Sequence, residues 1–284
     1  MSLLLWLRRL QDRLIEALYS KPIRVHHGKR AMGNVDYDSN RVLREYLLFH
    51  YGLEDEVLSK GHGPKEGLNF PVRTVSQLLD RNSLPSSSSR ALDLGCAVGR
   101  SSFELARIST EVVGVDYSST FISAAQTLRD SGELSFEFPS HGERAIPSVA
   151  RVPSGVDSSR VRFITEDACR LPNGLGGVDI VHAANLLCRL PDPGALIERL
   201  PELVRPGGQL LLATPFTWLE EFTPMDKWLG GRLSGKDSAE ALKEILSPNF
   251  CLEIEIDLPF LLREHERKFQ YGISYGTRWR RLSV

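Results

Sequence analysis

The chain has 284 residues, a formal net charge of −1, 42% hydrophobic residues and 25% charged residues. These values are ordinary for a globular protein with one large domain, and they give no bulk electrostatic attraction to nucleic acid. The four cysteines lie far apart without a Cys-x-x-Cys pair, which argues against a disulfide framework and a zinc site. We therefore expect a cytoplasmic protein without a metal or a nucleic-acid partner.

The N-terminal residues 1–33 are expected to form an amphipathic helix and an arm. Trp6, Leu10 and Leu14 recur at helical spacing, which predicts a helix over about residues 3–19. The apolar start is far shorter than the roughly 18 residues of a membrane span, and it has no signal-peptide cleavage site. Targeting or surface attachment stays open as an alternative role, and the polar residues 21–38 read as a linker or arm.

A helical cap is predicted within residues 34–82. Residues 42–51 have apolar side chains at helical spacing and stop at Gly52, a suitable C-terminal cap, and residues 72–79 predict a second short helix. The serine-rich residues 83–89 read as a hinge before the next element.

From residue 90 to the end of the chain, strands and helices alternate. We predict strands near 90–95, 111–116, 161–165, 178–184 and 209–214, and helices near 99–108, 118–130, 193–204 and 237–247. This alternation predicts parallel strands with helices on both faces of the sheet.

Two departures from a simple alternating pattern refine this fold. Residues 131–160 are an insertion that includes a possible hairpin strand at 134–138. Runs 252–258 and 268–280 have no room between them for a crossover helix, so they must pair antiparallel. We therefore predict a Rossmann-like α/β domain over residues 90–284, with a seven-stranded, mostly parallel sheet and an antiparallel last strand, as in class I methyltransferases.

The turn from Gly95 to Gly99 predicts a cofactor site at the carboxyl ends of the strands. A nicotinamide dinucleotide site would need glycines at positions 97 and 100, which hold Ala97 and Arg100. S-adenosylmethionine has no pyrophosphate and does not need that turn. Asp116, about 20 residues further on, is placed to accept hydrogen bonds from ribose hydroxyls. These features favour S-adenosylmethionine as the cofactor.

The remaining cofactor contacts follow from the chemistry of that ligand. Gly95 and Gly99 allow the backbone to approach the methionine portion, while Asp93 or Arg100 would meet its amino or carboxylate group. The residues expected around ribose and adenine are Asp116, Tyr117, Asp167 and the backbone of Ala168. The alternatives are that Asp93 only braces the turn and that Tyr117 is ordinary packing.

Several longer segments carry a more specific resemblance. They are Glu45–Gly52, Leu68–Arg73, Ala91–Ala106, Ala184–Leu186, Thr214–Pro224 and Lys227–Gly231. Together they resemble the 5-thiohistidine (4-mercaptohistidine) N-methyltransferases of ovothiol biosynthesis. In many members of that family this domain is the C-terminal half of a bifunctional synthase. The resemblance begins near Asn34, so it leaves out the first 33 residues and the sulfoxide-synthase half.

This resemblance implies methyl transfer from S-adenosylmethionine to the imidazole π nitrogen of 5-thiohistidine, giving ovothiol A. It also implies functional coupling to a separate sulfoxide synthase. Because only a nitrogen without a proton is nucleophilic, the enzyme must select one imidazole tautomer. We expect Asn185, His50 or Glu221 to contribute that hydrogen bond as catalytic groups.

The acceptor is a zwitterionic amino acid, so its site should offer a cation, an acid and aromatic walls. The candidates for substrate binding are Tyr46, Tyr51, Asn69, Arg73, Trp218 and Glu220. Simple packing is the alternative for Tyr46, His50 and Trp218, and a structural ion pair is the alternative for Arg73. His182 reads as a satisfied core histidine because it lies inside a buried strand.

Two other functional interpretations stay open at this point. One is methylation of another small molecule or of a histidine-containing peptide. The other is a non-catalytic, cofactor-binding partner that regulates a second enzyme, which the missing glycine at Ala97 and the added N-terminus would suit. The sequence leaves the oligomeric state open.

Overall fold

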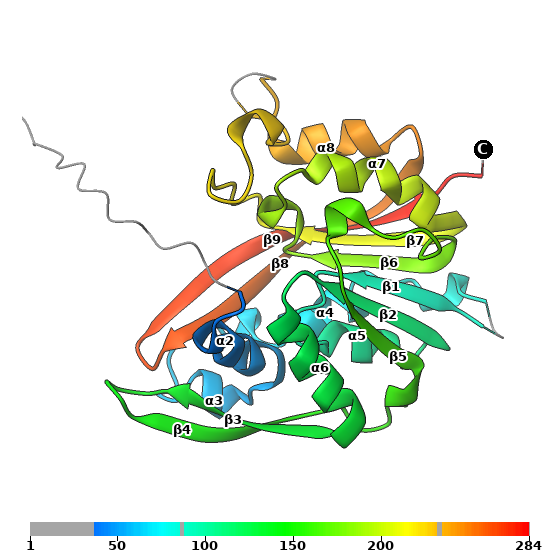
Figure 1. Cartoon of the computed structure of the whole chain (residues 1–284). Helices are drawn as coiled ribbons and strands as arrows, with labels where there is room; N and C mark the ends of the chain where they lie inside the picture. Colours follow the sequence, from blue (N-terminus) through cyan, green and yellow to red (C-terminus); the bar gives the residue numbers. More distant parts are fainter. Residues whose placement is uncertain (1–36, 86–87, 232–234, 284) are drawn as a thin grey trace, which may run out of the picture. The chain divides into compact units, whose positions relative to one another are not determined.

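The computed structural model describes residues 37–85, 88–231 and 235–283. The chain divides into residues 1–35 and 36–284, and all the elements below belong to the second unit (Figure 1). The N-terminal helix expected over residues 3–19 lies outside the described residues, as do residues 86–87 of the serine-rich hinge.

Short helices precede the sheet, in the region expected to be helical. These are α2 (Asn40–Tyr51), α3 (Glu54–Val57), η1 (Lys65–Gly67), α4 (Phe70–Ser76) and η2 (Arg81–Ser83). The Ser39 side chain accepts a hydrogen bond from the Val42 N–H, which caps α2, and the helix ends at Gly52 as the sequence predicts.

The central sheet has seven strands. They are β1 (Arg90–Leu94), β2 (Glu111–Asp116), β5 (Val161–Thr165), β6 (Val178–Ala184), β7 (Val204–Thr214), β8 (Phe250–His265) and β9 (Lys268–Arg281). Their order is β5-β2-β1-β6-β7-β9-β8, and β9 runs antiparallel to both of its neighbours. The predicted Rossmann-like methyltransferase fold with an antiparallel last strand is confirmed.

Helices cover both faces of the sheet (Figure 1). On one face α2, α4, α5 (Arg100–Leu105) and α6 (Ser119–Ser131) pack on alternate strand residues such as Ala91 and Val112. On the other face α7 (Pro193–Leu203) and α8 (Ser238–Leu246) pack on Leu92 and its neighbours. Single helical turns complete the connections at η3 (Ser158–Arg160), η4 (Ala168–Arg170), η5 (Leu187–Arg189) and η6 (Met225–Lys227).

The insertion forms a separate hairpin of β3 (Glu133–Pro139) and β4 (Ala145–Arg151). Its Phe138 is buried against Leu48 and Leu261. At its tip, His141 Nε2 lies 2.5 Å from Glu266, which also pairs with Lys60 at 2.6 Å. These contacts join the insertion to the tip of the β8–β9 hairpin.

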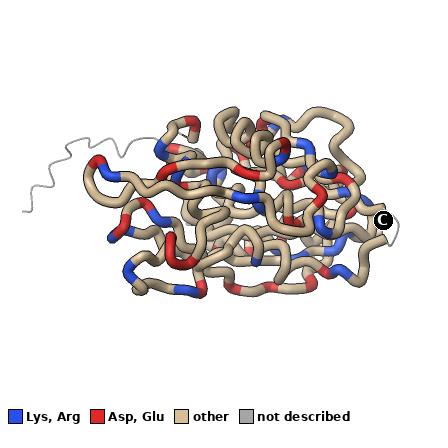
Figure 2. Tube along the Cα trace, turned by 90° about the horizontal axis from the view of Figure 1, so that it is seen from below, with Lys and Arg blue, Asp and Glu red and all other residues tan. Residues whose placement is uncertain are grey.

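Charges of both signs are interspersed along the described chain (Figure 2). Within the described ranges, no helix combines the length and apolar character required to cross a bilayer.

Candidate functional site

Strained backbone gathers at the carboxyl ends of the parallel strands. Ala97, Asn185 and Phe216 follow β1, β6 and β7, and their φ angles are 46°, 54° and 51°. Non-glycine residues in this left-handed region cost about 1–2 kcal/mol each, and such strain clusters at functional sites. Ligands also bind open α/β sheets at this edge. Both arguments place the candidate site here.

Close packing against the sheet, in addition to space for a ligand, explains the glycines of the Gly95–Gly99 turn. Gly95 N–H and Cys96 N–H both donate to Val115 O, at 2.8 and 3.0 Å, so the turn is tied to β2. Gly99 has a φ of 86°, and a Cβ there would lie 2.6 Å from the Phe163 ring. A glycine is therefore required at Gly99 for the turn and α5 to approach the sheet.

Asp116 accepts hydrogen bonds that hold the glycine turn, and its carboxylate can still accept hydrogen bonds from a ligand. Its two carboxylate oxygens accept N–H groups of Ala97 and Ser118, each at 2.9 Å. Burial raises the pKa of this carboxyl to about 6. Because each oxygen has a second lone pair, the group fits the ribose hydroxyls of an adenosyl cofactor.

Asp93 is buried within the protein. It accepts hydrogen bonds from Ser101 Oγ at 2.7 Å and Ser102 Oγ at 2.6 Å, and it lies 2.7 Å from His182 Nδ1. His182 Nε2 in turn lies 3.0 Å from Thr74 Oγ1. These contacts favour the bracing role for Asp93, and they make His182 the satisfied core histidine that its strand position predicts.

Arg100 and Tyr51 connect α2 to the cofactor turn. The Tyr51 hydroxyl donates to Val98 O at 2.8 Å, and the Arg100 guanidinium lies over the Tyr51 ring. Arg100 Nε donates to Glu104 at 3.1 Å, and Glu104 also pairs with Arg107 at 2.8 Å, so Arg100 shares its counter-ion. The cap helix is therefore fixed against the turn by polar contacts.

The expected adenine-side residues lie on neighbouring loops. Tyr117 is 77% exposed directly after β2. Asp167 accepts the Cys169 N–H at 2.8 Å, which caps η4, and Ala168 is buried behind it. The Glu166 N–H donates to Asp116 O at 3.0 Å, so the two loops start side by side.

Aromatic rings pack together near Asp116, whose charge acts on the Tyr46 hydroxyl. The centroid of the Tyr46 ring lies 4.8 Å from that of Phe121 and 6.1 Å from that of Tyr37. The centroids of the Tyr37 and Phe222 rings are 6.2 Å apart. We call Tyr37, Tyr46, Phe121 and Phe222 the aromatic row. Sequence reasoning missed Tyr37 because it sits at the end of a polar arm, yet the neighbouring Asp38 accepts a hydrogen bond from Ser118 and holds it in place.

His50 is the buried residue of the cap with an unsatisfied polar atom. It is 8% exposed, and its Nδ1 has no hydrogen-bond partner among the described residues. Burial lowers its pKa to about 3. The imidazole is therefore neutral at physiological pH, and its ring lies 5.9 Å from Tyr46.

Asn185 is oriented by the last strand. Its backbone N–H donates to Ala213 O at 2.7 Å, and its side-chain Oδ1 accepts a hydrogen bond from Ser274 Oγ at 2.7 Å. Because the oxygen is used in this way, the amide offers its NH₂ group as a donor. No local pattern around Ser274 identified it, since it is brought to Asn185 only by the pairing of β9 with β7.

Other expected substrate residues have contacts elsewhere. Arg73 donates to the carbonyl oxygens of Leu68 and Pro259, and Asn69 is the N-cap residue that precedes α4, with a φ of 54°. Trp218 Nε1 donates to Ser238 at 3.0 Å, and its ring stacks on Trp228. Glu220 and Glu221 are exposed, and neither forms an ion pair with a described residue. A packing role is thus available to Arg73 and Trp218.

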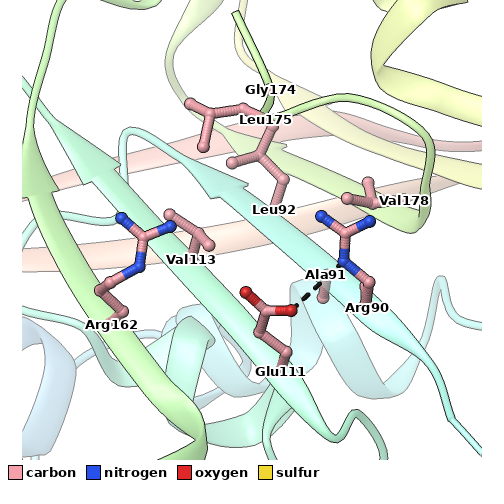
Figure 3. Close-up of a pocket in the computed structure, with 9 residues that line it drawn as sticks. All are labelled: Arg90, Ala91, Leu92, Glu111, Val113, Arg162, Gly174, Leu175 and Val178. Carbon is pink, nitrogen blue, oxygen red and sulfur yellow. Dashed lines mark ion pairs between the residues drawn. The ribbon is translucent and has the colours of Figure 1, made fainter. Parts of the chain in front are cut away.

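A small cavity lies at the opposite end of the sheet (Figure 3). Arg90, Glu111 and Arg162 line it over an apolar floor, with a volume of about 70 Å³. A water molecule occupies roughly 30 Å³, so this space suits a few waters rather than a nucleoside. Arg90 and Glu111 form an ion pair across it at 3.3 Å.

Comparison with known proteins defines the class. A family model described as "Methyltransferase domain" matches residues 69–253, which is more than half of the chain. The chain belongs to this methyltransferase family, and the predicted enzyme class is confirmed. The prediction of S-adenosylmethionine as the cofactor is confirmed at the level of the family.

Individual relatives are more distant. The chain is 28% identical over 123 residues to the ubiquinone biosynthesis O-methyltransferase of Coxiella burnetii, covering 43% of this chain and 42% of the relative. It spans about half the length of the curated relatives it matches.

Solved structures resemble the chain more weakly in sequence. A SAM-dependent methyltransferase from Methanosarcina mazei has a TM-score of 0.49 and 20% identity, and the match covers 72% of this chain and 96% of that one. The N-methyltransferase NodS from Bradyrhizobium japonicum, in complex with S-adenosyl-L-homocysteine, has a TM-score of 0.47 and 14% identity. That match covers 85% of this chain and 99% of NodS.

Proposed function

We propose that this chain methylates the imidazole π nitrogen of 5-thiohistidine and forms ovothiol A. The observation that carries the proposal is the aromatic row beside Asp116, with the buried, neutral His50 next to Tyr46. Apolar walls with few polar groups suit a flat heterocycle. The resemblance of Glu45–Gly52 and Thr214–Pro224 to thiohistidine methyltransferases supports the choice of acceptor.

We propose that the cofactor is held by Asp116 at the ribose, by Asp167, Ala168 and Tyr117 around adenine, and by the Gly95–Gly99 turn at the methionine portion. The bound donor supplies an electrophilic methyl group on a sulfonium. A nitrogen–carbon bond forms as the sulfur–carbon bond breaks, and the sulfur keeps the electron pair. One proton leaves the imidazole, which balances the reaction.

His50 and Asn185 are proposed to orient the acceptor. With a pKa of about 3, His50 is too weak a base to take the acceptor's proton at neutral pH, but its free Nδ1 can form one hydrogen bond. The Asn185 amide offers donors in addition. Holding one tautomer in line with the methyl group supplies rate through positioning. Glu221, proposed as a third orienting group, is exposed.

The test uses the full chain with methyl-labelled S-adenosylmethionine. We expect label in 5-thiohistidine at the π nitrogen, with little transfer to free histidine, a histidine-containing peptide or a catechol. A preference for the peptide or for the catechol would reject the proposal. Binding of S-adenosylhomocysteine without transfer to any acceptor would indicate a regulatory partner instead.

A further inference from the structure

Arg189 is a cation at the candidate site that the sequence did not single out. It ends η5, directly after β6 and Asn185, and it is half-buried. Its guanidinium carbon lies 5.0 Å over the centre of the Phe222 ring, the last member of the aromatic row. Arg189 thus lies at one end of the row, and His50 lies beside Tyr46 further along it.

The guanidinium is held by groups that do not neutralise it. Nη1 donates to the carbonyl oxygens of Cys188 at 2.9 Å and Thr217 at 2.8 Å, and Nη2 donates to Thr217 Oγ1 at 3.2 Å. No described Asp or Glu lies within ion-pair distance of it, whereas Arg100, close to the cofactor turn, pairs with Glu104.

The pattern of these bonds leaves one edge of the guanidinium open. The acceptors of Nη1 and Nη2 belong to Cys188 and Thr217, and among the described residues no acceptor lies in hydrogen-bond geometry with Nε–H. Nε–H and one N–H of Nη2 point the same way, in the fork that binds a carboxylate through both oxygens. The Tyr37 hydroxyl is close enough to this guanidinium to hydrogen-bond with it: burial raises the pKa of that hydroxyl, and the charge of Arg189 opposes the rise.

We propose that Arg189, assisted by the Tyr37 hydroxyl, binds the carboxylate of the methyl acceptor and makes the enzyme selective for acceptors that carry one. The inference rests on the proposed function, since it assumes that the acceptor ring occupies the aromatic row. It gives the role of the carboxylate-binding cation to Arg189 rather than to Arg73, because Nε and Nη2 of Arg73 both donate to backbone carbonyl oxygens and that edge of its guanidinium is occupied.

The experiment compares 5-thiohistidine with 5-thiohistamine, which lacks the carboxylate, in the wild-type chain and in Arg189→Met, Arg189→Lys and Tyr37→Phe. For Arg189→Met we expect kcat/KM for 5-thiohistidine to fall by about ten- to hundredfold, mostly through KM. We expect 5-thiohistamine turnover to change less than threefold. Arg189→Lys should recover part of the loss, because it keeps the charge without the fork.

Two controls separate the possible outcomes. Arg162→Met removes an exposed arginine at the opposite end of the sheet (Figure 3) and should change neither substrate. The dissociation constant of S-adenosylhomocysteine should stay within twofold in every variant. Equal losses with both acceptors, or a loss that follows cofactor affinity, would overturn the role of Arg189.

The proposed function can fail separately. If wild-type protein binds neither thiohistidine nor thiohistamine, calorimetry with S-adenosylhomocysteine present would compare a benzoate with the matching benzyl alcohol. If the wild-type chain prefers the benzoate and Arg189→Met abolishes this preference, the role of Arg189 is supported. Only the choice of 5-thiohistidine as the acceptor is then rejected. Preference for the neutral ligand would overturn the inference itself.

Discussion

The two ends of the same sheet treat charged groups in opposite ways. At the amino ends of the strands, Asp179 accepts Arg205 Nε at 2.5 Å and the Arg90 N–H at 2.8 Å, and Arg90 pairs with Glu111. At the carboxyl ends, His50 Nδ1 has no described partner and Arg189 has no described counter-ion. The paired charges at the amino ends support the fold, whereas a neutral imidazole without a described hydrogen-bond partner and a cation without a described counter-ion, both near a strained edge, indicate groups that are free to bind a ligand.

The strongest test of this contrast exchanges one aspartate at each end. We expect Asp116→Ala to weaken S-adenosylhomocysteine binding by ~1.5–3 kcal/mol, because the hydrogen bonds to ribose are lost. Asp179→Ala should lower the free energy of unfolding by a similar ~1.5–3 kcal/mol, since Arg205 loses its partner, while binding is unaffected. Calorimetry and urea unfolding measure both. If Asp116→Ala leaves binding intact, Asp116 does not hold the cofactor.

The two buried histidines give the next comparison. His50→Leu removes an unsatisfied polar atom, so we expect the free energy of unfolding to rise by ~1 kcal/mol while kcat falls at least about tenfold. His182→Leu should destabilise the protein, because Asp93 and Thr74 lose a partner. Thermal unfolding and steady-state kinetics would show this. A destabilised but fully active His50→Leu would make His50 a packing residue.

The raised pKa of Asp116 predicts opposite pH trends with and without ligand. Its pKa in the folded state, about 6, exceeds the ordinary 3.8, so its contribution to the stability of the free protein is present below pH 4 and lost as the pH rises to about 6. Ribose hydroxyls need the ionised carboxylate, so cofactor affinity should fall about tenfold from pH 7 to pH 5. Titration calorimetry would detect this fall. Affinity in Asp116→Asn should vary much less over this range.

Ala97 offers the smallest effect. Its left-handed φ of 46° costs about 1–2 kcal/mol, and glycine would relieve it at a cost of roughly 0.5–1 kcal/mol in the unfolded chain. We therefore expect Ala97→Gly to raise the free energy of unfolding by ~0–1.5 kcal/mol. Urea unfolding of the variant and the wild-type chain, each with and without S-adenosylhomocysteine, would measure this difference in the free energy of unfolding. A clear loss of stability would mean that the Ala97 methyl group packs usefully.

Sequence reasoning predicted the sheet well because its signals are local. The strands at 111–116, 161–165 and 178–184 match the observed bounds, since buried parallel strands read as short apolar runs. The lack of a crossover helix between the last two runs was enough to predict their antiparallel pairing.

The candidate site was predictable only in part, because its polar contacts join distant positions. Asp116 follows a recognisable strand, but the pairing of Asn185 with Ser274 spans 89 residues and has no local signature. Arg189 follows the fourth predicted strand, so its position at the carboxyl edge of the sheet could have identified it as a candidate site residue. What singles it out is its place over the Phe222 ring, together with the absence of a described counter-ion, and both observations need the fold.

The contact between Ser274 and Asn185 also determines when, during synthesis of the chain, the candidate site can be completed. A chain that is still emerging from the ribosome can contain the glycine turn, Asp116 and the aromatic row long before β9 exists. Until that last strand inserts between β7 and β8, the Asn185 amide has no partner to fix its direction. Methyl-transfer competence should therefore appear only once β9 has formed and paired with β7, and a truncation inside β9 should abolish it.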